Sequence, residues 1–213
     1  MTLANHLANH LVAFVKAPRL GRVKTRLAAD VGVVAAWAFY RRTTAAILHR
    51  LGGEGRWQTW LAITPDAAAD VPGLWPNAWR RIGQGTGDLG QRMTRVMGAL
   101  PPGPVIIIGT DTPDIRPEHI ARGFRALGRH DAVFGPAADG GYWLVGLRRR
   151  PRLPEIFQGV RWSTEFALAD TLANARGLDV AMLDVLDDVD DGAGLERWRR
   201  REAAGRPSAA PRT

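Results

Sequence analysis

The sequence of 213 residues contains no cysteine, and this absence excludes several kinds of site at once. A disulfide framework, a thiolate nucleophile and a zinc site with cysteine ligands all require that residue. The sequence also lacks any apolar stretch near the roughly 18 residues of a membrane-spanning helix. The N-terminal residues 1–10 carry no basic run, and the apolar run Leu11–Val15 is shorter than the core of a secretion signal. We therefore expect a cytoplasmic protein without a membrane span.

Lysine is almost absent as well. Of the 29 basic residues only Lys16 and Lys24 are lysines, and both lie in one short segment. Because the rest of the chain uses arginine, this pair indicates a place where a compact ammonium is preferred to a planar guanidinium. Much of the formal net charge of +8 lies in short arginine runs without interleaved aromatic residues. Such runs are typical of a solvated surface, so we expect no nucleic-acid partner.

Short apolar runs alternate with amphipathic segments along the chain, which predicts an α/β fold with a mostly parallel sheet and helices on both faces. The β-branched run Val105–Ile108 is typical of a strand buried on both faces. The length suits a single domain over residues 11–200, with a disordered tail over residues 201–213. The expected strands are 11–15, 57–63, 79–82, 105–108, 132–135, 142–147 and 180–183. The expected helices are 33–51, 88–100, one that starts at 117, 164–175 and 195–200.

A basic loop follows the first expected strand. Ligands of such sheets bind beyond the carboxyl ends of the strands, so this loop is a candidate binding element. Residues 16–26 carry five cationic side chains around Gly21, which lets the backbone turn closely toward a ligand. The pattern suits a diphosphate or triphosphate, and we give Lys24 the catalytic role of stabilising charge on the departing phosphate. A solvated basic loop is the alternative. The residues expected to contact the phosphates are Lys16, Arg19, Gly21, Lys24 and Arg26.

Two acidic segments supply candidate metal ligands. Asp111 follows the most apolar expected strand, where a carboxylate would face the ligand cleft. Asp190 belongs to an acidic run over residues 184–191. Carboxylate oxygens suit Mg²⁺ or Mn²⁺, and such an ion would neutralise a diphosphate as its bond to the transferred group breaks. A turn role for Asp111, and a plain charged loop around Asp190, are the alternatives.

Two glycine-rich segments are expected beside the same cleft. Gly87 and Asp88 lead into a helix, whose N-terminus can hold an anion or a base edge. Asp139 precedes the pair Gly140 and Gly141. Paired glycines permit close backbone approach, so we assign both to nucleotide binding. We assign Asp139 a catalytic role toward a substrate hydroxyl or phosphate. An Asp-Gly hairpin turn would have the same local sequence.

In their order along residues 11–200, these segments resemble a bacterial family of glycosyltransferase-like proteins. The segments that carry the resemblance are K-A-P-R-L-G-R-V-K-T-R-L, G-D-L-G-Q-R-M, G-T-D-T-P-D, P-A-A-D-G-G-Y-W-L-V-G-L and F-Q-G-V-R-W-S-T-E. Members are labelled as transferases associated with radical-SAM and selenoprotein domains, or as arsenosugar-biosynthesis glycosyltransferases. The resemblance implies the GT-A fold of nucleotide-diphospho-sugar transferases. More distantly, the family is similar to the molybdenum-cofactor and phospholactate guanylyltransferases.

The resemblance also implies roles for individual residues. The basic loop corresponds to a nucleotide-phosphate loop, and Asp111 to a metal-binding aspartate before Thr-Pro. The segment Asp188–Asp190 resembles a C-terminal acidic segment that completes the metal site, although Asp191 and Gly192 replace its usual Thr-Pro.

Residues and resemblance together predict a metal-dependent transferase that uses a nucleotide-activated donor. The first hypothesis is glycosyl transfer from a nucleotide sugar to a small-molecule acceptor. The alternative is nucleotidyl transfer from a nucleoside triphosphate to a phosphorylated small molecule. Both reactions need positioned positive charge on a leaving phosphate, so the same residues serve either. Hypotheses of other classes are a non-catalytic nucleotide-binding protein and a basic nucleic-acid-binding module.

Overall fold

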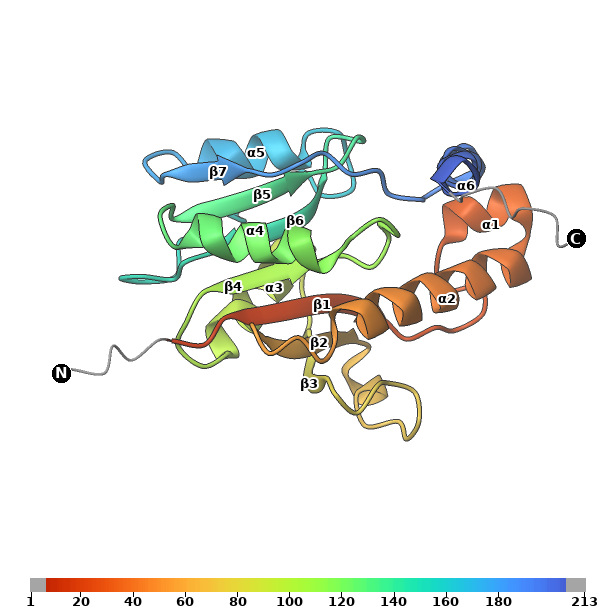
Figure 1. Cartoon of the computed structure of the whole chain (residues 1–213), viewed down its shortest axis with the longest axis horizontal. Helices are drawn as coiled ribbons and strands as arrows, with labels where there is room; N and C mark the ends of the chain where they lie inside the picture. Colours follow the sequence, from red (N-terminus) through yellow and green to blue (C-terminus); the bar gives the residue numbers. More distant parts are fainter. Residues whose placement is uncertain (1–6, 206–213) are drawn as a thin grey trace, which may run out of the picture.

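Seven strands form one mixed sheet at the centre of the protein (Figure 1), as seen in a computed structural model that describes residues 7–205. The strands are β1 (His10–Lys16), β2 (Gln58–Thr64), β3 (Arg80–Gly83), β4 (Val105–Ile108), β5 (Ala132–Pro136), β6 (Tyr142–Leu147) and β7 (Val180–Met182). Their order across the sheet is β3-β2-β1-β4-β6-β5-β7. All neighbours are parallel except β6, which runs antiparallel to both β4 and β5. The predicted α/β architecture with a mostly parallel sheet is confirmed.

The central strands are apolar because both faces of the sheet are covered. All four residues of β4 are buried, as their continuous β-branched sequence predicted. Helices α2 (Val33–Leu51) and α4 (Pro117–Leu127) pack on one face, where they share a core with Leu11 and Ile106. Helices α3 (Leu89–Ala99) and α5 (Ala167–Asn174) pack on the other, around residues such as Phe134. Figure 1 shows α2 and α4 in front of the sheet and α3 behind it.

Two helices differ most from the sequence prediction. Residues Thr25–Val31, predicted as part of the basic loop, form helix α1, whose Leu27 is fully buried. Helix α6 spans Gly192–Gly205, longer than the predicted 195–200, and its Leu195 and Trp198 pack in a third core cluster with α1 and α2. The predicted start of a disordered tail at residue 201 therefore falls inside a helix, and residues 206–213 lie outside the described part. A short 3₁₀ helix, Asp66–Ala68, also follows β2.

Within residues 7–205, none of the helices combines the length and the apolarity that crossing a bilayer would require.

Candidate functional site

A cleft of about 640 Å³ opens at the carboxyl ends of the central parallel strands. The last residues of β1 and β2, Lys16 and Thr64, line it together with the residues that follow β3 and β4. Ligands of open α/β sheets bind at this edge, because the strand ends and the loops after them converge there. The lining is predominantly polar, and it includes the cationic side chains of Lys16, Arg22, Lys24, Arg26 and Arg92.

The ammonium of Lys24 lies between two carboxylates. Its Nζ is 2.7 Å from Oδ1 of Asp111 and 2.6 Å from Oδ1 of Asp190. The Lys24 side chain is only 6% exposed, whereas the two aspartates are 48% and 41% exposed and open to the cleft. Burial alone would lower the pKa of Lys24, but the charges and hydrogen bonds of Asp111 and Asp190 outweigh burial and raise that pKa. Lys24 is therefore charged at neutral pH.

The backbone explains how these three residues meet. Lys24 adopts a left-handed conformation, with φ 48° and ψ 49°, where the basic loop turns into α1. The Val189 N–H donates to the Asp111 carbonyl at 3.0 Å, so the acidic segment before α6 is attached to the loop after β4. Val189 is fully buried in the same cluster as Leu27 of α1. Packing of this one valine thus places Asp190 beside Lys24.

Asp111 and Asp190 alone do not enclose a divalent cation, but they can supply part of its ligands beside a bound substrate. One cation, the Lys24 ammonium, already contacts an oxygen of both Asp111 and Asp190. In the described part of the chain no group of three or more acidic or histidine side chains could enclose a metal ion. Mg²⁺ is commonly held by one or two carboxylates plus substrate phosphates and water, and Asp111 and Asp190 match that donor set. Nearby, burial and then the negative charges of Asp190 and Asp139 raise the pKa of Asp188 to about 6.

The structure divides the residues predicted for the basic loop. Lys16, Lys24 and Arg26 line the cleft, whereas Arg19 and Gly21 are exposed outside its lining. The end of β1 is held by Tyr40, whose hydroxyl donates to the Lys16 carbonyl and accepts from the Lys16 N–H, each at 2.8 Å.

Asp88 and Gly87 begin helix α3. Asp88 is its N-cap, because its Oδ1 accepts from the Gln91 N–H at 2.8 Å and the Gln91 side chain accepts from the Asp88 N–H in return. Gly87 has φ 104°, a conformation that favours glycine. These two residues shape the helix start, and the next turn brings Leu89 and Arg92 into the cleft lining.

Asp139 and its glycines form the turn between β5 and β6. The Asp139 Oδ1 accepts from the Gly141 N–H at 2.9 Å, and the Gly141 carbonyl accepts from Ala137 N–H at 3.0 Å. Gly140 has φ 85°, and a Cβ there would lie 2.2 Å from the Glu165 carbonyl oxygen. Asp139, Gly140 and Gly141 are not among the residues that line the cleft. The hairpin interpretation accounts for this geometry, and their roles toward a nucleotide stay predictions.

Further residues of the lining, among them Gln84, Arg92 and Ser163, were not assigned from the sequence. Gln84, which is 2% exposed, donates its amide to the carbonyls of Val15 and Ala62 and accepts from Arg92 Nη1 at 2.7 Å. Burial lowers the pKa of Arg92, and the Asp88 charge only partly opposes this effect. Among residues 7–205 Arg92 forms no ion pair, so it is a half-buried cation suited to an anionic ligand. The third residue is Ser163.

A signal for Arg92 was present in the quoted segment G-D-L-G-Q-R-M, since an arginine one turn into a helix after a glycine-rich lead can reach the same ligand. Gln84 and Ser163 had no comparable local signal. Gln84 acts by bridging two strands, and Ser163 reaches the cleft from a distant segment.

Comparisons with known proteins agree with this fold. A model of the family described as "Uncharacterized protein conserved in bacteria (DUF2064)" matches residues 47–164, more than half of the chain. A crystal structure from Desulfovibrio desulfuricans G20, provisionally described as a nucleotide-diphospho-sugar transferase, is 29% identical with a TM-score of 0.84. The match covers 93% of this chain and 90% of that chain. None of the curated proteins compared with the chain matches it.

More distant structures share the fold. Rv0371c of Mycobacterium tuberculosis H37Rv, solved in complex with manganese, has a TM-score of 0.57 at 15% identity, over 90% of this chain and 97% of its own. CMP:2-keto-3-deoxy-manno-octonic acid synthetase, solved in complex with CTP, has a TM-score of 0.57 at 14% identity, over 93% of this chain and 99% of its own. The chain thus has the fold of the nucleotide-diphospho-sugar transferases.

Proposed function

The chain belongs to the DUF2064 family of bacterial proteins, and from that membership and the geometry of the cleft we propose that it is a metal-dependent glycosyltransferase that uses a nucleotide sugar. The observation that carries the proposal is the contact of the Lys24 ammonium with both Asp111 and Asp190 at the mouth of a cationic cleft. This arrangement combines carboxylates for a divalent cation with positive charge for phosphates.

In this proposal the chain holds the diphosphate and stabilises the charge that it gains as the sugar departs. Lys16, Arg22 and Arg26 surround the phosphates with donors and lower the cost of bringing them into the cleft. Asp111 and Asp190 would hold Mg²⁺ or Mn²⁺, which supplies Lewis-acid stabilisation of the leaving diphosphate. Once the carboxylates are shared with that ion, Lys24 is free to donate to a phosphate oxygen.

Nucleotidyl transfer is the second candidate function. It is favoured by the fold shared with the CTP-bound synthetase, whose name describes a nucleotidyl-sugar product. In that reaction the α-phosphorus is attacked and pyrophosphate leaves, whereas in glycosyl transfer the nucleoside diphosphate leaves. Both would use the same positive charges.

The test is incubation of the purified chain with nucleotide sugars and nucleoside triphosphates, with Mn²⁺ or Mg²⁺ and a panel of small alcohols and phosphorylated acceptors. Mass spectrometry identifies the products. Release of a nucleoside diphosphate with a new glycoside supports the proposal. Pyrophosphate with a new nucleotidyl conjugate supports the second candidate. Failure of the chain to bind any nucleotide, together with DNA binding that survives at physiological salt, would instead favour a nucleic-acid module.

A further inference from the structure

The long segment between β6 and α5, residues 148–166, reaches the cleft through Ser163. Ile156, Phe157 and Val160 of this segment are buried. A Cβ added at Gly90 of α3 would lie 2.6 Å from the Phe157 carbonyl oxygen and 2.8 Å from the Trp162 ring. The segment therefore packs directly on the helix that borders the cleft, and only glycine at position 90 permits this approach.

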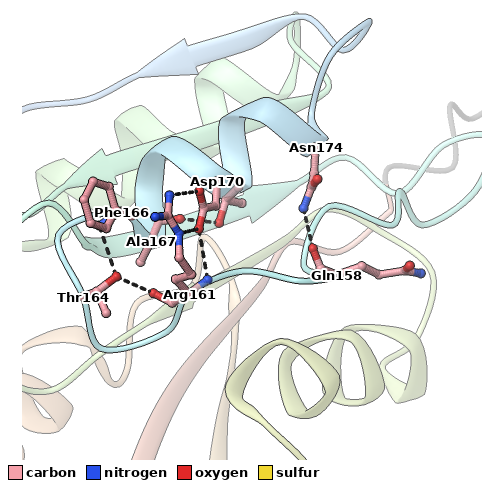
Figure 2. Close-up of polar contacts among 8 residues, drawn as sticks. Gln158, Arg161, Thr164, Phe166, Ala167, Asp170 and Asn174 are labelled. Carbon is pink, nitrogen blue, oxygen red and sulfur yellow. Dashed lines mark hydrogen bonds and ion pairs between the residues drawn. The ribbon is translucent and has the colours of Figure 1, made fainter.

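The last part of this segment is clamped to α5 by an arginine–aspartate pair (Figure 2). Arg161 donates from Nε to Oδ2 of Asp170 at 2.9 Å, from Nη2 to Oδ1 at 2.8 Å, and from its own backbone N–H to Oδ2 at 3.0 Å. The guanidinium also lies 4.0 Å from the centre of the Phe166 ring. Exposed ion pairs contribute little to stability in general. The three hydrogen bonds between Arg161 and Asp170 therefore serve mainly to fix the orientation of the backbone at Arg161.

Further bonds close the turn between Arg161 and Phe166. The Thr164 hydroxyl donates to the Arg161 carbonyl at 2.7 Å, and the Phe166 N–H donates to the same hydroxyl oxygen at 3.3 Å (Figure 2). On the other side, the Leu168 N–H donates to the Gly140 carbonyl at 3.0 Å. The turn is thus attached to α5, and the first turn of α5 is attached to the β5–β6 hairpin.

Ser163 lies at the apex of this turn in a left-handed conformation, with φ 62°. Among residues 7–205 only three residues other than glycine have a positive φ: Lys24, Arg149 and Ser163. Two of the three, Lys24 and Ser163, line the cleft. Unfavourable backbone conformations persist where the surrounding structure enforces them, and they gather at functional sites.

The charges around Ser163 differ from those of the rest of the cleft. The Arg161 charge is matched by Asp170, so this arginine is not free to attract a phosphate. Ser163 offers a neutral hydroxyl that both donates and accepts hydrogen bonds. The phosphates are drawn instead to the cations contributed by β1, the loop after it and α3. A hydroxyl-bearing group, which needs a donor and an acceptor without charge, fits the part of the cleft beside Ser163.

We propose, resting on the proposed function, that Ser163 binds a hydroxyl-bearing group, either the sugar joined to the diphosphate or the acceptor. Arg161 and Asp170 are then positioning residues that hold Ser163 in place. Asp170→Asn keeps the size of the side chain that contacts Arg161 but removes its negative charge.

The experiment compares wild type with Ser163→Ala, Ser163→Gly and Asp170→Asn by calorimetry with Mn²⁺ present. The probes are nucleoside diphosphates, their hexose conjugates, and free hexose titrated in the presence of the nucleoside diphosphate. Ser163→Gly removes the hydroxyl and relieves the backbone conformation, whereas Ser163→Ala only removes the hydroxyl. We expect both variants to bind the hexose conjugate about three- to tenfold more weakly, the effect of one lost hydrogen bond, with nucleoside diphosphate affinity unchanged. Asp170→Asn should show the same selective loss.

The control is Glu54→Gln, which weakens an exposed pair in which Arg56 Nε and Nη2 contact Glu54 Oε2 at 2.9 Å and 2.7 Å, away from the cleft. This variant should bind every probe as wild type does. Loss confined to the conjugate assigns the hydroxyl group to the donor, and loss confined to free hexose assigns it to the acceptor; either supports the inference.

Unchanged conjugate and hexose affinities in both Ser163 variants would overturn the inference while leaving the proposed function intact. Equal losses for the nucleoside diphosphate and its conjugate in Asp170→Asn would show general damage and remove the positioning role. If wild type binds no nucleoside diphosphate at all, the proposed function fails and the inference fails with it.

Discussion

The ammonium of Lys24 lies 2.6 Å from Oδ1 of Asp190, a residue 166 positions later in the chain. The same ammonium lies 2.7 Å from Asp111, so one buried cation contacts both candidate metal ligands. Two carboxylates that converge on one point repel each other, and a cation between them offsets part of that repulsion. A lysine amine and a divalent ion therefore use the same oxygen atoms, which connects metal binding with the position of Lys24.

Asp111→Asn should abolish the metal-dependent part of ligand stabilisation. A nucleoside diphosphate with Mn²⁺ at about 100 times its Kd should stabilise the wild type by about 2.7 kcal/mol, which corresponds to roughly 5–10 °C in Tm. The amide oxygen is a weaker ligand without charge, so the variant should respond only to the nucleotide. Thermal melts with and without Mn²⁺ measure this difference. Asp114→Asn is the matched control, because Asp114 contacts Arg201 at 3.2 Å and does not line the cleft. An unchanged metal response in Asp111→Asn would remove Asp111 from the site.

Lys24→Arg should behave as a severe substitution although it keeps the charge. The Lys24 side chain is 6% exposed between two carboxylates, and a wider guanidinium cannot occupy the same place. We expect the single-turnover rate to fall more than nucleotide affinity, because only interactions that strengthen in the transition state accelerate the step. Lys24→Ala should lower the rate on the order of a hundredfold or more.

A binding measurement gives Lys24 a second test. Without nucleotide, Lys24→Ala should bind Mn²⁺ more tightly than wild type, because no ammonium competes for the carboxylates. Calorimetry with Mn²⁺ alone provides the comparison. Equal rates for wild type and Lys24→Arg would mean that the basic loop supplies only a diffuse positive field.

Gly140→Ala should destabilise the fold more than Gly159→Ala. Both glycines have positive φ, 85° and 64°, so alanine at either position has a similar backbone cost of roughly 1–2 kcal/mol. At Gly140 the new Cβ would also lie 2.2 Å from the Glu165 carbonyl oxygen, whereas nothing lies within 4 Å of it at Gly159. Urea unfolding measures the loss in free energy of unfolding for both variants, and the difference between the two losses is the steric contribution at Gly140. Equal losses would show that the hairpin and the Ser163 turn are not held in close contact in solution.

His10 should make the protein less stable at mildly acidic pH. It is fully buried, and its Nδ1 accepts from Trp60 Nε1 at 3.3 Å. Burial lowers the pKa of His10, an effect to which Arg149 and Arg80 add, although the Pro102 carbonyl opposes it. The folded state then binds fewer protons than the unfolded chain, whose histidine titrates near 6.5. This contribution to stability is complete above about pH 6.5 and decreases as the pH falls below that value.

Thermal melts from pH 8 to pH 5 test this dependence. His10→Gln removes the titrating group, and its Tm should fall less steeply with acid than that of wild type. His49→Gln, at an exposed position on α2, should keep the wild-type slope. Identical slopes for wild type and His10→Gln would contradict the role given to His10.

The sequence by itself determined most of the secondary structure and the position of one site residue, Asp111. Val105–Ile108 and Tyr142–Leu147 are strands with the bounds predicted, and Val33–Leu51 is a helix with the bounds predicted. Hydrophobic periodicity is a local property, so it can be read without knowing the fold. The position of Asp111 followed in the same way, because a residue directly after a central parallel strand lies at the ligand edge of the sheet.

Only the tertiary structure decided which residues meet there. Helix α1 is seven residues long and depends on burial of Leu27, which no local pattern of the arginine-rich segment indicated. Asp190 reaches Lys24 because Val189 enters a core cluster with Leu27, and Ser163 reaches the cleft because residues 156–162 pack against α3. These placements arise from contacts between residues far apart in the chain. Their free energy comes from apolar burial in the finished fold, and the local sequence around each site residue does not contain it.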